Sequence, residues 1–338
     1  MSSKTLKVLI VGAGLMGEVH SKNYNNITDV EIVGIVDKNT AKAGALAEKY
    51  GCRYFEELTD GFVCRPDFVD ICLPTRFHKE SIIESFKAGM DVICEKPISL
   101  SVQEACDIVD ASKEYGRKFM VAHVVRFWPE YAKLSDMINK NEFNNIKCAT
   151  FFRYGPSPNW SEGNWMLSDK KSGGIIYDVA IHDFDFVISL FGMPDWVFAK
   201  KSMMGEDYTA YVNVILGYKD VNVMIESGFI TAVSYPFTTG FRLNNGEVTL
   251  EYENKSGKGL LMYSAEPGVK KLEYPDYDPY KAELNYFMDC IRNDMKPAVG
   301  SGEDAIKAVL LASLIEESAK NNKKIEVIFD GPASYQRG

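Results

Sequence analysis

Short apolar runs alternate with amphipathic segments over the first third of the chain. Strands are predicted at 8–11, 30–36, 52–54, 68–73, 91–94 and 118–122, because the runs are too short for helices and rich in β-branched residues. The segments between them carry helix signals: Asn39 is a suitable N-cap, Gly51 a suitable end, and Ser101 with Glu104 forms a capping box. Strands that alternate with helices predict an α/β fold, a doubly wound parallel sheet of the Rossmann type.

The pattern changes after His123. A helix is expected at 130–139, a strand of period two at 146–154, and an apolar helix from Gly173 to about residue 191. Consecutive strands with turn signals follow at 196–274, then helices ending near 292 and 321 and a last strand at 324–329. We therefore predict a dinucleotide-binding domain at 1–123 and an α+β domain at 124–338 with a large, mostly antiparallel open sheet. Its exposed face needs a cover, so we expect a homodimer or homotetramer formed through this sheet.

The amino-acid composition limits the classes of partner that we expect for this chain. The 338 residues are 46% hydrophobic and 25% charged, and the net charge of −9 comes without a basic cluster, which argues against nucleic acid. No apolar run reaches membrane-spanning length, and the N-terminal residues do not form a signal peptide. The seven cysteines are scattered and never spaced C-x-x-C, so we expect reduced thiols, a cytoplasmic location and no metal site.

The first predicted strand runs into Gly12, Gly14 and Gly17, spaced G-x-G-x-x-G. In a dinucleotide site the first glycine allows a sharp turn, the second a close approach of the pyrophosphate, and the third close packing of the next helix. The second strand ends at Asp37, 20 residues beyond Gly17, where such a site places a carboxylate for a ribose hydroxyl. This predicts NAD, although the neighbouring Lys38 leaves NADP possible; the alternative is a structural turn.

Ligands of open parallel sheets bind beyond the carboxyl ends of the strands. That rule also selects Leu73–Pro74–Thr75 and Glu95–Lys96–Pro97, and it places His78 where it could touch the cofactor. An ammonium at Lys96 could donate a hydrogen bond to a substrate hydroxyl and stabilise a developing alkoxide. The alternative for Lys96 is a solvated lysine that closes a strand.

Asp178 and His182 are four residues apart in the predicted apolar helix, so they share one face. A carboxylate beside an imidazole suits removal of a proton from an alcohol. The alternatives are a packed histidine at an acidic helix start, or a metal ligand that lacks a second nearby histidine. Trp160 and Trp165 could stack on a sugar or anchor a loop. His20 is more simply explained by packing.

Together these residues resemble the Gfo/Idh/MocA family of nicotinamide-dependent oxidoreductases, which includes glucose–fructose oxidoreductase and inositol dehydrogenase. The resemblance rests on the glycine motif, on Glu95-Lys96-Pro97, and on Gly173-Gly174 followed by Asp178, His182 and Asp185. The segment that begins at Gly302 is also similar. Near His123 the chain departs from the many members that have an asparagine there, which leaves the substrate contacts of that segment open.

The resemblance implies a Rossmann domain followed by an α+β domain whose open sheet mediates oligomerisation. It implies that Lys96, Asp178 and His182 are the catalytic and substrate-binding set, with His182 as the base. The expected function is NAD-dependent oxidation of a sugar or cyclic polyol; the alternatives are a glycosidase that oxidises its substrate transiently and a non-catalytic dinucleotide-binding regulator. The cofactor-binding residues expected from strand ends and resemblance are Gly12, Gly14, Leu15, Met16, Gly17, Asp37, Lys38, Leu73, Pro74, Thr75, His78, Glu95, Lys96, Pro97 and Arg126.

Overall fold

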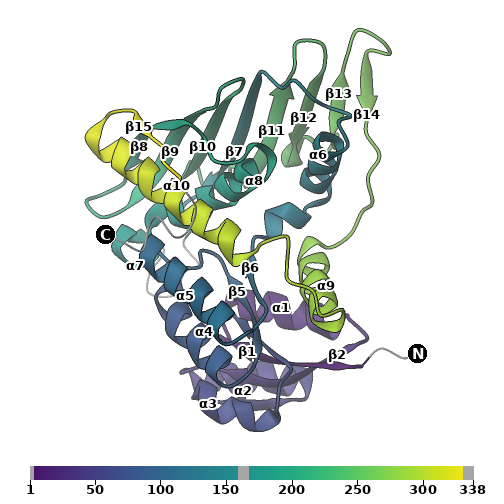
Figure 1. Cartoon of the computed structure of the whole chain (residues 1–338), viewed down its shortest axis with the longest axis vertical. Helices are drawn as coiled ribbons and strands as arrows, with labels where there is room; N and C mark the ends of the chain where they lie inside the picture. The colour runs from purple at the N-terminus through teal and green to yellow at the C-terminus, as the bar shows by residue number, and fades with distance from the viewer. Residues whose placement is uncertain (1–3, 159–166, 330–338) are drawn as a thin grey trace. The chain divides into compact units, whose positions relative to one another are not determined.

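The computed structural model divides the chain into two compact units (Figure 1). It describes residues 4–158 and 167–329. The first unit takes in the residues up to Phe127 together with Tyr277–Ile306, and the second takes in Trp128–Asp276 and the residues from Lys307 onward. Besides residues 1–123, the first unit therefore contains residues 124–127 and the returning segment Tyr277–Ile306.

A six-stranded sheet in the order β3-β2-β1-β4-β5-β6 organises the first unit, and every pairing in it is parallel. This confirms the doubly wound α/β prediction. The strands are β1 (Leu6–Val11), β2 (Val30–Val36), β3 (Arg53–Phe55), β4 (Phe68–Ile71), β5 (Asp91–Glu95) and β6 (Phe119–Ala122). The helices are α1 (Leu15–Asn25), α2 (Thr40–Tyr50), α3 (Leu58–Gly61), α4 (His78–Lys87), α5 (Val102–Glu114) and α9 (Pro279–Arg292), with short 3₁₀ turns η1 (Phe62–Cys64), η2 (Thr75–Phe77) and η3 (Val124–Phe127).

Helix α9 belongs to the first unit because its apolar face joins the core of that unit. Leu284, Phe287 and Met288 are buried in one cluster with strand residues such as Ile10. The ring of Phe287 lies edge-on to that of Phe68, with 5.7 Å between the centroids. Burial of these side chains stabilises the return of the chain by roughly 1.5–3 kcal/mol for each large residue.

The second unit contains a nine-stranded sheet in the order β14-β13-β12-β11-β7-β10-β9-β8-β15. The β7–β10 pair is parallel and the other pairs are antiparallel, as predicted. The strands are β7 (Cys148–Pro156), β8 (Trp196–Met203), β9 (Thr209–Gly217), β10 (Asn222–Thr231), β11 (Thr238–Asn244), β12 (Thr249–Glu253), β13 (Leu261–Tyr263), β14 (Val269–Lys271) and β15 (Ile325–Glu326). Its helices are α6 (Pro129–Asn139), α7 (Asp169–Ser172), a π-helical turn η5 (Ile176–Ala180), α8 (Ile181–Phe191), the 3₁₀ turn η6 (Asn254–Ser256) and α10 (Gly302–Asn321), which begins in the first unit.

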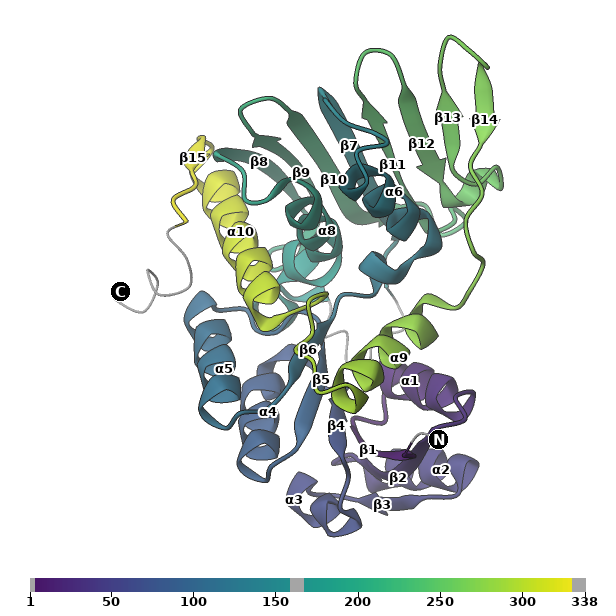
Figure 2. The same cartoon turned by 45° about the vertical axis from the view of Figure 1, so that its right-hand side comes forward.

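Helices cover one face of this sheet, where Figure 2 shows α6, α8 and the later part of α10. Tyr131 of α6 packs its ring against Phe186 of α8 and Phe241 of β11, at centroid distances of 4.9 and 5.0 Å. Ser318 of α10 accepts the backbone N–H of Ala199 in β8. The strands alternate buried and less buried residues, so their other face carries the less buried side chains.

The helix predicted from Gly173 to about residue 191 is observed, since helical residues run without a break from Gly174 through the π-helical turn η5 into α8. Gly173 and Gly174, whose φ angles are 78° and 63°, separate this helix from the short α7 that precedes them. One expectation for this unit needs correction. The strand predicted at 324–329 is only the two-residue β15.

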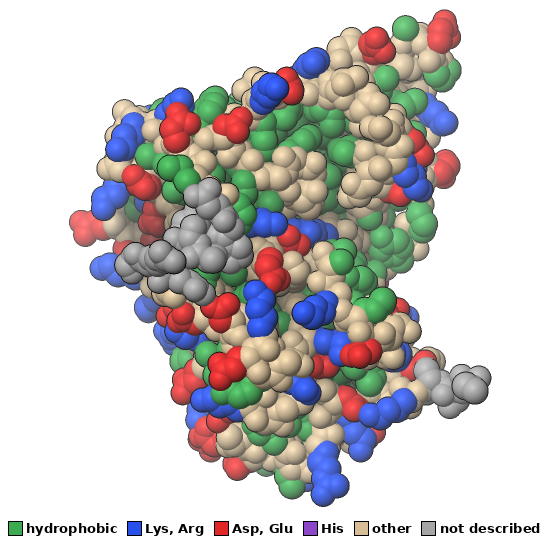
Figure 3. Space-filling view, viewed as in Figure 1, with side chains coloured by type: hydrophobic (Ala, Val, Ile, Leu, Met, Phe, Trp, Pro, Cys, Tyr) green, Lys and Arg blue, Asp and Glu red, His purple; other side chains and the backbone are tan. Residues whose placement is uncertain are grey.

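Two surface properties bear on partners. No helix among the residues described has the length and apolar character needed to span a membrane. On the face drawn in Figure 3, the described acidic and basic side chains are interspersed and gather into no large patch of one sign.

Candidate active site

In the glycine loop between β1 and α1, the first and third glycines leave no room for a side chain, whereas the middle one does. A Cβ at Gly12, whose φ is 109°, would lie 2.5 Å from the carbonyl oxygen of Cys72, and a Cβ at Gly17 would lie 1.8 Å from that of Gly12. Both positions therefore require glycine. Nothing lies within 4 Å of the corresponding position at Gly14, so a phosphate has room to approach the N-terminus of α1 there.

Asp37, which directly follows β2, braces this loop. Its Oδ2 accepts the N–H of Ala13 at 2.7 Å, and its Oδ1 accepts the N–H of Asn39 at 2.7 Å. A carboxylate has about four lone-pair sites, so two remain for ribose hydroxyls. Lys38 is exposed, and its ammonium pairs with the carboxylate of Glu57. This pairing makes Lys38 less available as a ligand for a phosphate. The open space at Gly14 and the spare acceptors of Asp37 fit NAD.

His78 connects the loops that follow β4 and β5. The side chain is fully buried, with Nδ1 2.9 Å from the carbonyl oxygen of Pro97 and Nε2 2.8 Å from that of Leu73. Burial lowers the pKa of His78, even though both carbonyls act to raise it. The structure thus gives the ring a bracing role between the two strand-end loops; that it touches the cofactor stays a prediction.

The carboxyl end of β5 carries Glu95 and Lys96. Glu95 is 6% exposed, and its Oε2 accepts the backbone N–H of Lys96 at 3.1 Å. Burial acts to raise the pKa of Glu95, but His20 and Lys96 together hold it below its usual value. Lys96 itself is half-buried. Leu73 and Pro74 follow β4 and are also half-buried, while Thr75 is 7% exposed.

Arg126 lies in η3, after the last strand of the sheet. Its Nη1 is 3.2 Å from Oδ2 of Asp304, near the start of α10, and the side chain of Arg126 is 10% exposed. The pair connects the end of the Rossmann sheet to the returning segment of the first unit. Its contact with the cofactor stays a prediction.

In the second unit, Asp178 lies in η5 and His182 is the second residue of α8, so the two do not share one regular α-helix as expected. They nevertheless differ from their surroundings: from Gly174 to Ile188 every residue is buried except these two, which are half-buried. In a segment this apolar, the partial exposure of an acid and an imidazole is the feature expected of groups that meet a ligand.

The start of α8 is held by a buried ion pair that sequence reasoning did not identify. Nε and Nη2 of Arg153, on β7, each lie 3.0 Å from an oxygen of Asp183, and the side chains are 3% and 0% exposed. Two parallel hydrogen bonds fix the first turn of α8, and therefore His182, against the sheet. One signal for this pair was present in the sequence: Arg153 occupies a position of the period-two strand that faces the core.

The double glycine before this segment has a steric cause. A Cβ at Gly174 would lie 2.1 Å from Oδ1 of Asp169. That carboxylate also accepts the N–H and the hydroxyl of Thr209 on β9 at 2.7 and 2.5 Å. Trp160 and Trp165, the predicted sugar-stacking residues, lie outside the described part of the chain.

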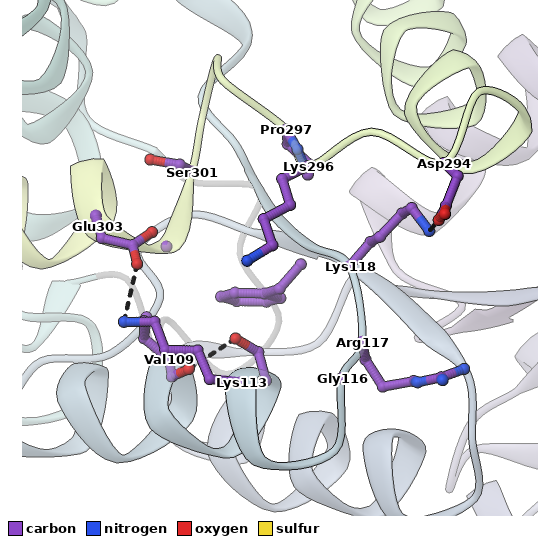
Figure 4. Close-up of a pocket in the computed structure, with 13 residues that line it drawn as sticks. Val109, Lys113, Gly116, Arg117, Lys118, Asp294, Lys296, Pro297, Ser301 and Glu303 are labelled. Atoms are coloured by element: carbon purple, nitrogen blue, oxygen red, sulfur yellow. Dashed lines mark hydrogen bonds and ion pairs between the residues drawn. The ribbon is translucent and has the colours of Figure 1, made fainter.

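A separate cavity of about 370 Å³ lies in the first unit, next to the start of α10 (Figure 4). Two of its three lysines are paired: Lys113 with Glu303 at 2.9 Å and Lys118 with Asp294 at 2.7 Å. The cavity lies at the amino end of β6, opposite the strand ends that the glycine loop follows. None of the predicted site residues within 4–158 and 167–329 lines it.

Comparison with known proteins agrees with both units. The family model "Oxidoreductase family, NAD-binding Rossmann fold" matches residues 6–123, and the "GFO/IDH/MocA C-terminal domain" matches residues 131–251. The D-glucoside 3-dehydrogenase of Escherichia coli is 30% identical over 57% of this chain and 56% of that protein. The inositol 2-dehydrogenase of Rhizobium meliloti is 26% identical over 96% of this chain and 99% of that protein.

A solved structure of levoglucosan dehydrogenase with NADH shares the fold, with a TM-score of 0.87 over 96% of this chain and 99% of that chain at 20% identity. The glycine loop, the strand-end loops and the segment from Gly173 to Asp185 lie within the ranges that the two family models match. The chain is a member of the Gfo/Idh/MocA family of NAD-binding oxidoreductases.

Proposed function

We propose that the protein is a dehydrogenase that oxidises a hydroxyl of a sugar or cyclic polyol with NAD. The observation that carries the proposal is the shared exposure of Asp178 and His182 in a segment whose other residues are buried. A packed histidine would be buried like its neighbours, and a surface helix would show more than two positions that are not buried. Relatives named D-glucoside 3-dehydrogenase and inositol 2-dehydrogenase support this substrate class.

The residues divide the chemistry between them. Neutral His182 accepts the proton of the substrate hydroxyl, and Asp178 accepts a hydrogen bond from a substrate hydroxyl or from the imidazole. The ammonium of Lys96 donates to the reacting oxygen and stabilises its developing negative charge. Bound NAD supplies the hydride acceptor. The buried Arg153–Asp183 pair keeps His182 in place without contacting the substrate.

We also propose a homodimer or homotetramer formed through the uncovered face of the nine-stranded sheet. Phe198, Ile215, Met224 and Thr150 lie opposite one another across four neighbouring strands of that face. Met224 is 45% exposed, although it stands in the middle of the row. Phe198, Ile215 and Met224 are apolar, and apolar side chains side by side on a sheet face are typical of a surface that pairs with a second copy. The seven free cysteines support a cytoplasmic location.

A substrate panel tests the function. Inositols, glucosides and free sugars are each incubated with the protein and with NAD or NADP, and reduced nicotinamide is followed by its absorbance. Accumulation of NADH with at least one cyclic polyol or sugar is the expected result. Product release without net NADH would instead indicate the transiently oxidising glycosidase, and binding without turnover of any compound would indicate a regulator.

A further inference from the structure

A group of buried titratable side chains lies beneath the glycine loop, and the proposed reaction uses none of them directly. His20 of α1, Asp70 of β4 and Glu95 of β5 come from three elements and meet in the core of the first unit. The His20 and Asp70 side chains are 0% exposed and that of Glu95 is 8% exposed. His20 Nδ1 lies 2.8 Å from Asp70 Oδ2, and Nε2 lies 3.3 Å from Glu95 Oε1.

Both nitrogens of one imidazole thus face a carboxylate oxygen. A neutral imidazole has a single N–H, so it would direct a lone pair at one of the two carboxylates. An imidazolium directs no lone pair at either carboxylate: its Nδ1–H donates to Asp70, and its positive charge attracts Glu95 across an Nε2–Oε1 ion-pair contact that lacks hydrogen-bond geometry. Two buried carboxylates without a positive partner would also be costly, because each loses its hydration. The geometry therefore selects the charged form of His20.

The other groups that face His20 leave this conclusion intact. Cys72 Sγ lies 3.5 Å from Nδ1, and burial raises the pKa of this thiol, so it stays neutral. Tyr24, one helical turn along α1, is neutral for the same reason. From α9 come the ring of Tyr280, 6.3 Å away, and the buried Glu283, a third acid of this core. Burial alone would lower the pKa of His20, but the charge of Asp70 and its hydrogen bond to the ring raise it well above the usual value.

One member of this group, Glu95, also contacts Lys96. Glu95 holds His20 through Oε1 and the backbone N–H of Lys96 through Oε2, so one carboxylate connects the imidazolium to the residue that follows the strand. We propose that His20 is a positioning residue: as an imidazolium between Asp70 and Glu95, it fixes the carboxylate that receives the Lys96 N–H and thereby sets how Lys96 leaves β5. The role of Lys96 in this statement rests on the proposed function.

Nuclear magnetic resonance of the ¹⁵N-histidine-labelled protein tests the charge without any substrate. There are four histidines, and each signal set is assigned by its loss when that histidine is replaced. At about pH 8, roughly 1.5 units above the ordinary histidine value of about 6.5, both His20 nitrogens should still carry protons. A neutral tautomer at that pH would overturn the proposal, and the wild-type spectrum decides this even if a His20 variant fails to fold.

Hydrogen exchange tests the connection to Lys96. In His20→Gln, the Lys96 amide should exchange at least about 10-fold faster than in the wild type, because its carboxylate acceptor is no longer fixed. Cys72→Ala is the matched control, since Cys72 forms its side-chain hydrogen bonds to the same imidazole and to Asp70; its Lys96 amide should exchange at the wild-type rate. Equal exchange in His20→Gln and the wild type would contradict the proposal.

With a substrate in hand, a double-mutant cycle separates positioning from general stability. His20→Gln should lower kcat by about 10-fold with little change in the dissociation constant of NADH, and it should have no further effect in a Lys96→Ala background. Independent, multiplying effects of the two substitutions would show that His20 does not act through Lys96. Absence of turnover by the wild type would count against the proposed function, while the spectral and exchange results would still decide the role of His20.

Discussion

At the scale of single residues, Asp37 shows how one side chain can serve the loop and the ligand together. It accepts backbone N–H groups of Ala13 and Asn39, and its remaining lone pairs are available to a ribose. The same negative charge repels the additional phosphate of NADP. The choice between the two cofactors therefore depends on this carboxylate more than on the neighbouring Lys38, whose ammonium pairs with Glu57.

The wild type should therefore have a higher kcat/KM with NAD than with NADP. Asp37→Ala should lower kcat/KM for NAD by about 10- to 100-fold, which corresponds to the loss of a hydrogen bond to a charged group worth about 1.5–3 kcal/mol. The ratio of kcat/KM with NAD to kcat/KM with NADP should fall at the same time. Lys38→Ala is the control and should leave the ratio nearly unchanged. Steady-state kinetics with both cofactors would contradict the assignment if the wild type preferred NADP.

At the scale of elements, the buried Arg153–Asp183 pair is the contact that fixes α8 on β7. Arg153→Met leaves a buried aspartate without its counter-charge, so the free energy of unfolding of the second unit should fall by about 3–5 kcal/mol. Arg153→Met combined with Asp183→Leu should restore most of that loss. Lys140→Met is the control, because its pair with Asp136 is exposed and worth about 0.5 kcal/mol or less. Denaturant unfolding measures the free energy of unfolding of these three variants. A decrease of less than about 1 kcal/mol in Arg153→Met would contradict the role of the pair.

Elements with strong local signals could be predicted from the sequence. The apolar runs of the Rossmann sheet and the glycine turn are specified by neighbouring residues, so β1, β2 and β4 appear close to where they were expected. The contact that requires glycine at position 174 could not be predicted, because it depends on Asp169, which occupies the space that a side chain at Gly174 would need. The Arg153–Asp183 pair joins residues 30 positions apart, and no local pattern indicates such a contact.

The histidines show the same limit. The position of His20 one turn after Gly17 suggested only packing, since its carboxylate neighbours come from β4 and β5. The contact of His78 with the cofactor stays a prediction, but its place after a strand end did not indicate that both of its nitrogens face backbone carbonyls. In each case the decisive partners are distant in sequence, and only the folded sheet brings them to the ring.

At the scale of the whole molecule, the proposed oligomer uses the uncovered face of the nine-stranded sheet. A charge in the middle of its apolar row should be incompatible with a second copy, so Met224→Lys should shift the protein toward monomer. Glu48→Gln on the exposed side of α2 changes the net charge by the same amount and should leave the oligomer intact. Light scattering at micromolar concentration measures the mass. A wild type that is monomeric there would contradict the proposed interface.

The most direct test of the central claim is the turnover of His182→Ala with a polyol or sugar that the wild type oxidises. We expect kcat to fall by roughly 10²–10⁴-fold, the usual contribution of a general base, while the dissociation constant of NADH hardly changes. The rise of wild-type kcat/KM with pH, which reflects loss of the imidazole proton, should be absent from the variant. If His182→Ala turned over near the wild-type rate and its kcat/KM rose with pH as in the wild type, the assignment of His182 as the base would be contradicted.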